Sequence, residues 1–168
     1  MEQNTQALLL EFRTLVSTLR QRGVDFPTME AVLLDSEDHR IVLEHDGTVT
    51  LPGFGVSFRL NPMERTVYTL MVEHPEGLKA EDLWEHYDEL VSIYSRMSWF
   101  GDSEALEDAV DTLCDDSRAT FYSNLSRIKK KFTSALGAGA ASKYAVLRGK
   151  DNVYRVEAAC EGLVEGSF

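Results

Sequence analysis

An apolar stripe at helical spacing lies near the start of the chain. Steps of four, three and four residues place four apolar side chains on one face of a helix: Leu8, Phe12, Leu15 and Leu19. The pattern predicts a helix over residues 5–22 that ends at Gly23, because glycine readily closes a helix. Residues 1–26 are therefore expected to form an N-terminal helix. Its stripe packs either on the rest of the domain or on its own copy in a homodimer.

The next stretch alternates short apolar runs with turn residues, which is typical of β-strands. The pair Asp46-Gly47 is a hairpin signal, and Pro52-Gly53 marks a second turn. The sequence therefore predicts a small antiparallel β-meander ahead of the helices. Its strands are expected at residues 30–35, 40–44, 48–51 and 55–60.

From residue 61 the apolar pattern becomes helical. Asn61, Pro62 and Glu64 combine an N-cap, a first-turn proline and a capping-box glutamate, so a first helix begins there and ends in the turn at 74–77. Residues 81–94 have the broad apolar face of a second helix. A third, basic helix is predicted over 118–136.

An acidic connector, residues 96–117, separates the second and third helices. Four of its apolar residues follow helical spacing and allow a short helix inside it: Leu106, Ala109, Val110 and Leu113.

After the third helix, residues 137–141 are expected to form a flexible break. Residues 144–148 and 153–156 then read as two strands around a turn at 149–152, which gives a terminal hairpin. Residues 161–168 are expected to be a C-terminal tail. Strands, three helices and a hairpin make residues 27–160 an α+β domain with the layout of a winged helix-turn-helix, which carries the acidic insertion at 96–117.

Positive charge is concentrated in one part of the chain. Residues 118–150 hold eight basic residues and no acidic one, whereas residues 1–117 hold eight basic and 24 acidic residues; the whole chain has a formal net charge of −11. Such asymmetry is typical of a protein that presents one face to a polyanion.

The third helix and the hairpin supply side chains suited to DNA. Phe121, Leu125, Ile128 and Phe132 define its buried side, so the other side presents polar groups. Four of these suit base edges in a major groove: Thr120, Ser123, Asn124 and Arg127. Four further cations are expected to hold phosphates, two on the helix and two on the hairpin: Lys130, Lys131, Arg148 and Lys150.

Four segments, in order, resemble the DNA-binding effector domain of bacterial response regulators of the OmpR/PhoB type. The segment NLSRIKKKF at 124–132 resembles that family's recognition helix, and VLRGKDNVYRVE at 146–157 resembles its wing. Segments 60–78 and 79–87 resemble its first helix and the start of its second. The resemblance implies a transcriptional regulator that places helix 118–136 in the major groove and wing 144–157 on the backbone or in the minor groove.

The chain departs from the family in three places. The residues before the meander are too few for a receiver domain, so a phosphorylation switch is not expected. The connector 96–117 is longer and more acidic than the family's turn, where contacts with RNA polymerase are made; here it is a candidate contact for polymerase or another protein. The wing is two residues longer and contains Asp151, which would weaken phosphate binding unless it points away.

A protein–protein adaptor remains the alternative function, with the acidic surface as its working face. A run such as Lys129–Lys131 is often only a solvated helix face.

Four aromatic residues are expected in or at the edge of the core rather than in a ligand pocket: Trp84, Trp99, Tyr87 and Tyr94. Trp99-Phe100 is either buried or part of a docking patch.

Other functions find little support. No nucleotide-binding or hydrolase motif occurs, and the four histidines and two cysteines follow no metal-ligand spacing, so no enzyme, metal or cofactor is expected. No apolar run reaches the roughly 20 residues of a membrane span, and no secretory signal is evident. We expect a cytoplasmic protein with free thiols.

Overall fold

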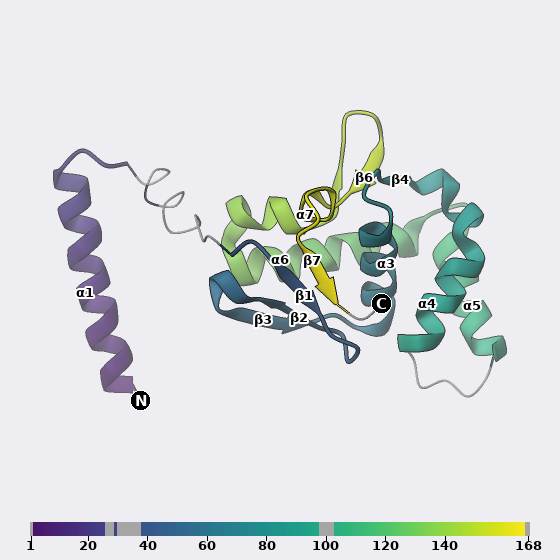
Figure 1. Cartoon of the computed structure of the whole chain (residues 1–168), viewed down its shortest axis with the longest axis horizontal. Coiled ribbons are helices and arrows are strands. Elements are labelled where there is room, and N and C mark those ends of the chain that lie inside the picture. Colours follow the sequence, from purple (N-terminus) through teal and green to yellow (C-terminus); the bar gives the residue numbers. More distant parts are fainter. Residues whose placement is uncertain (1, 26–28, 30–37, 98–102, 167–168) are drawn as a thin grey trace. The chain divides into compact units, whose positions relative to one another are not determined.

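The computed structural model describes residues 2–25, 29, 38–97 and 103–166, and the chain divides into two compact units, Met1–Glu37 and Asp38–Phe168 (Figure 1). The first unit contains helix α1, Glu2–Gln21, which confirms the predicted N-terminal helix. Gly23 follows it with a φ of +83°, as expected of a glycine stop. Five apolar side chains of α1 are exposed: Leu8, Leu9, Leu10, Phe12 and Leu15. The predicted strand at 30–35 lies outside the described residues.

The second unit begins with the predicted meander. Strands β1 (Ile41–Leu43), β2 (Thr48–Leu51) and β3 (Val56–Arg59) are antiparallel neighbours, and a single 3₁₀ turn, η1 (Pro52–Phe54), joins the last two. Strand β7 (Val164–Gly166) pairs in parallel with β1, so the sheet order is β3-β2-β1-β7. The prediction of a tail at 161–168 is therefore wrong for Val164–Gly166, because these residues form the edge strand of this sheet.

The helices begin as their caps predict. Helix α3 (Pro62–Glu73) has both capping-box bonds: the Glu64 amide donates to Asn61 Oδ1 at 2.8 Å, and the Asn61 amide donates to Glu64 Oε2 at 2.9 Å. The predicted second helix is instead two elements, the 3₁₀ helix η2 (Ala80–His86) and helix α4 (Tyr87–Met97). The connector contains α5 (Ser103–Cys114), which packs beside α4 (Figure 1).

The basic helix is longer than the sequence predicts. Helix α6 runs from Ala119 to Tyr144 and bends at Gly137, whose φ of 79° and ψ of 162° are not helical. Residues 138–144 therefore continue as helix beyond the kink, although a flexible break was expected at 137–141. The Tyr144 side chain is buried, and its carbonyl accepts a hydrogen bond from the Tyr68 hydroxyl at 2.7 Å. This contact fixes the end of α6 against α3.

A second sheet contains the predicted hairpin. Strands β5 (Leu147–Arg148) and β6 (Val153–Arg155) are antiparallel, and β4 (Leu78–Lys79) pairs with β6, so the order is β4-β6-β5; helix α7 (Glu157–Cys160) follows. Gly77 precedes β4 with a φ of +88°, and a Cβ there would lie 2.7 Å from the Tyr154 carbonyl oxygen. Glycine therefore permits the hairpin to pack closely against the turn after α3.

One hydrophobic core joins the first sheet to the helices. Phe132 of α6 packs edge to face on Phe58 of β3, with ring centroids 4.9 Å apart, and lies 5.4 Å from the ring of Tyr68. The second unit thus belongs to the α+β class. Cys114 and Cys160 are free thiols, as predicted. Within the described part of the chain, no helix combines the length and apolarity that a membrane crossing requires.

Candidate nucleic-acid interface

Helix α6 divides into a buried side and an exposed polar side. Phe121, Leu125, Ile128 and Phe132 are buried, as the sequence predicts. The exposed side presents hydroxyl and basic groups: Ser123, Ser126, Arg127, Lys129, Lys130 and Ser134. Because core packing fixes the rotation of the helix, these groups have a defined direction.

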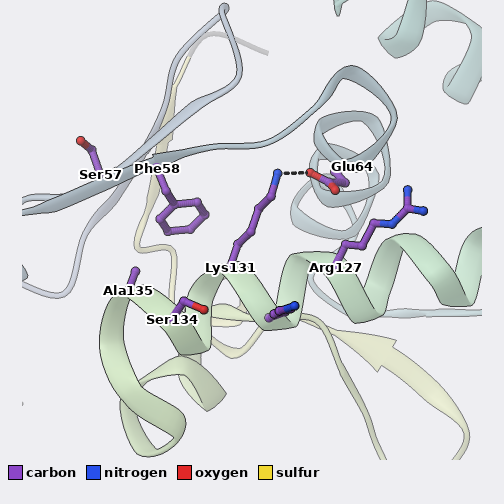
Figure 2. Close-up of a pocket in the computed structure, with 8 residues that line it drawn as sticks. Ser57, Phe58, Glu64, Arg127, Lys131, Ser134 and Ala135 are labelled. Atoms are coloured by element: carbon purple, nitrogen blue, oxygen red, sulfur yellow. Dashed lines mark hydrogen bonds and ion pairs between the residues drawn. The ribbon is translucent and has the colours of Figure 1, made fainter.

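Arg127 and Lys130 line an open hollow of about 590 Å³ between α6 and β3, which also includes Ser57 and Phe58 (Figure 2). Neither cation has a hydrogen bond or ion pair among the described residues. The hollow therefore presents two uncompensated positive charges, which suits an anionic ligand.

Lys131 lines the same hollow but is already engaged. Its Nζ lies 2.5 Å from Glu64 Oε2 and donates to the Arg59 carbonyl at 2.8 Å (Figure 2). The Glu64 side chain is only 2% exposed. Lys131 compensates a buried carboxylate and joins α6 to α3, so its predicted phosphate contact does not fit this structure.

Asn124 was predicted to read bases, but the structure places it in the core. It is 3% exposed, and its Nδ2 donates to the Thr120 carbonyl at 2.8 Å. The position lies three residues after Phe121 and four before Ile128, which puts it on the apolar side of the helix. Asn124 therefore cannot reach a base edge. Thr120, also predicted to contact bases, is half-buried in the first turn of α6.

Two further cations of residues 118–150, Arg118 and Lys143, are bonded to other groups of the fold. Arg118 precedes α6 with a φ of 55°, and its guanidinium donates to the Ala80 carbonyl at 2.7 Å, to the Cys114 carbonyl at 2.6 Å and to the Asp115 carbonyl. Lys143 Nζ lies 2.7 Å from Glu161 Oε2. Arg118 and Lys143 thus hold the ends of α6 rather than a ligand.

The hairpin presents its predicted cations to solvent. Arg148 and Lys150 are exposed, and Arg148 donates to Asn152 Oδ1 at 2.7 Å, a bond that leaves its charge uncompensated. Asp151 lies 2.6 Å from the Arg155 guanidinium. The Val153 amide and the Arg155 charge hold the pKa of Asp151 below its usual value. The acidic residue of the hairpin is therefore balanced within the hairpin.

A second hollow, of about 340 Å³, lies between the hairpin, the start of α6 and the β4–η2 segment. Its charges are mixed. Lys79, Arg118 and Arg148 face it together with Glu81, Asp116 and Asp151. Tyr122, which is 43% exposed, and Tyr154 supply an apolar part. The hairpin thus meets the start of α6 at a region that contains charges of both signs.

The opposite charge gathers on η2, α4 and α5. Trp84, which was expected in or at the edge of the core, is 48% exposed and stacks on Tyr87 with centroids 5.2 Å apart. The Tyr87 hydroxyl donates to Asp111 Oδ1 at 2.7 Å, and this bond, with burial, raises the Tyr87 pKa to about 12. Tyr94 is buried as predicted. Trp99 and Phe100 lie outside the described residues. Exposed carboxylates lie on the same three elements: Glu81 and Glu85 on η2, Asp88 on α4, and Glu107, Asp108 and Asp111 on α5.

No family model, curated protein or solved structure matches this chain.

Proposed function

We propose that the chain is a cytoplasmic, DNA-binding transcriptional regulator with a winged helix-turn-helix domain. Helix α6 enters the major groove, and the β5–β6 hairpin acts as the wing. The observation that supports this proposal best is the exposure of Arg127 and Lys130 on α6. Both project from the polar side of a helix whose other side is fixed in the core, and neither has a partner in the described part of the protein.

The contacts divide into base and phosphate groups. Arg127 is the principal base-reading residue, because its guanidinium can donate two parallel hydrogen bonds to guanine, and Ser123 and Thr120 assist it. Four cations bind phosphates: Lys130 and the exposed Lys129 on the helix, and Arg148 and Lys150 on the hairpin. Asn124 and Lys131 have no place in this interface because both are used inside the fold.

The acidic surface is compatible with DNA binding if it faces away from the duplex. At ordinary salt, charges are screened beyond a Debye length of roughly 8–10 Å. Repulsion from the carboxylates on α4 and α5 is then confined to DNA that lies close to those helices.

Random-sequence duplex DNA will bind, and the binding will weaken steeply with salt. Each neutralised phosphate contributes about −0.9 to the slope of log K against log salt concentration. With Lys129, Lys130, Arg148 and Lys150 as contacts, we expect a slope of about −3 to −4. Fluorescence anisotropy titrations between about 50 and 200 mM salt measure it. No binding at the lowest salt would exclude the regulator.

A homodimer through residues 5–22 would place two domains on half-sites about 34 Å apart. Phe12→Glu, on the apolar stripe of α1, is expected to shift a concentration-dependent dimer to monomer, because it buries a charge in the interface. Ser17→Glu, on the polar side of the same helix, is the matched control and leaves the dimer intact. Sedimentation equilibrium measures both. A wild-type monomer at all concentrations would assign the stripe to packing within the chain.

A protein–protein adaptor is the second candidate. It is favoured by the exposed Trp84–Tyr87 stack among carboxylates, because an aromatic patch with an acidic border suits a basic protein partner. The mixed charges beside the hairpin point the same way. If the chain binds DNA, the acidic connector 96–117 is the proposed contact for RNA polymerase or another protein. The salt titration separates the two functions, since an adaptor has no affinity for random duplex.

A further inference from the structure

Three side chains with metal-ligating atoms converge beside the end of α3. His74 is the C-cap of α3, His86 ends η2 and Glu89 lies in the first turn of α4. His74 Nε2 lies 3.0 Å from each carboxylate oxygen of Glu89, and His86 Nδ1 lies 3.1 Å from Glu89 Oε2. One atom of each residue lies within 4.8 Å of the other two.

Two of the three separations between the ligand atoms are close to those of a tetrahedral metal site. Ligands at about 2.0–2.1 Å from Zn²⁺ lie about 3.3 Å apart, so the nitrogen–oxygen distances of 3.0 and 3.1 Å need only small shifts. The two imidazole rings meet edge to face with centroids 4.6 Å apart. One nitrogen of each ring lies within hydrogen-bond distance of the Glu89 carboxylate.

A second carboxylate orients one of the histidines. Glu76 Oε1 lies 3.1 Å from His74 Nδ1, the ring nitrogen on the far side from Glu89. A carboxylate in this position fixes the tautomer of a metal-ligating histidine and makes its free nitrogen a stronger ligand. The cluster thus has an outer carboxylate that orients one of its ligands.

We propose that His74, His86 and Glu89 bind a divalent transition-metal ion of the zinc type. Two imidazole nitrogens and one carboxylate oxygen are a donor set that suits Zn²⁺, whereas Mg²⁺ and Ca²⁺ prefer oxygen alone. Three protein ligands leave a fourth position for water. This site runs against the expectation of no metal, and it does not depend on DNA binding.

The ion would clamp a junction of the fold. It ties the end of α3 to the joint between η2 and α4. The turn 74–77 in turn contacts the hairpin, through Gly77, and α7, through the Cys160 thiol, which lies 2.9 Å from the Pro75 carbonyl oxygen. Zinc should therefore raise the temperature of unfolding, because a ligand of the folded state alone stabilises that state.

Calorimetric titration of the full chain with Zn²⁺ tests the site, after chelator treatment and without a polyhistidine tag. We expect one ion per chain and a higher unfolding temperature. His86→Ala and Glu89→Gln should each weaken binding at least about tenfold, and Glu76→Gln, a positioning residue, by about 10–100-fold. His45→Ala is the matched control: His45 is exposed in the β1–β2 turn, and its loss leaves the affinity unchanged.

No stoichiometric zinc uptake, or equal affinity in all four variants, would overturn the proposal. Substitution by Co²⁺ on the wild-type chain provides a test that does not rely on any variant folding. The strong visible absorption of four-coordinate Co²⁺ supports the site, and a spectrum equal to that of aqueous Co²⁺ contradicts it.

Discussion

Arg127→Ala will weaken binding to the preferred DNA site by about 1–3 kcal/mol and will relax base preference at one position of that site. The Arg127 side chain is exposed on α6 and has no partner among the described residues. The substitution should therefore remove a DNA contact and no contact within the fold. A bidentate contact to guanine is worth this amount of discrimination. The measurement is anisotropy with a selected site and with each of its single-base variants.

Arg127→Lys is the conservative control for this experiment. Lysine keeps the charge but not the planar fork, so the variant should retain most non-specific affinity while it loses discrimination. A uniform loss across all sequences in Arg127→Ala, with unchanged base preference, would instead make Arg127 a phosphate contact. Neither substitution should change the unfolding temperature, because Arg127 supports no contact inside the fold.

The elements that the sequence predicts well are those with local signals. The capping box at Asn61 and Glu64 fixes the start of α3, and Gly47 marks the turn between β1 and β2. Strands β4 and β7 were not predicted, because each has only two or three residues and exists only through pairing with a distant strand. A pattern that is read along the chain contains no information on such pairings.

The difference between local signals and long-range contacts also explains which parts of the candidate site the sequence predicts. The exposed side of α6 follows from its apolar spacing, and that spacing, applied to position 124, would also have shown that Asn124 is buried. The bond between Lys131 and Glu64 joins residues 67 positions apart, so no local pattern reveals it. The convergence of His74, His86 and Glu89 likewise depends on how α4 packs against α3, and the spacing of these residues matches no metal motif.

Two adjacent lysines therefore have different expected roles, and paired variants separate them. Lys130→Ala should weaken binding to all DNA sequences alike and reduce the salt slope by about one, with no loss of stability, because the side chain is exposed and unpaired. An unchanged salt slope would remove Lys130 from the phosphate contacts. The variant also serves as the charge-matched control for Lys131→Ala.

Lys131→Ala will lower the free energy of unfolding by about 2–3 kcal/mol, since it leaves the Glu64 carboxylate buried without its cation. Removing one partner from a fully buried pair costs roughly 3–5 kcal/mol. The cost here is smaller because the Lys131 side chain is 35% exposed and Glu64 keeps the hydrogen bond from the Asn61 amide. Urea denaturation measures the loss, and the double variant Lys131→Met with Glu64→Gln should recover most of it. Equal stability of Lys131→Ala and Lys130→Ala would show that the Glu64 contact contributes nothing to the fold and would return Lys131 to the set of cations available for DNA.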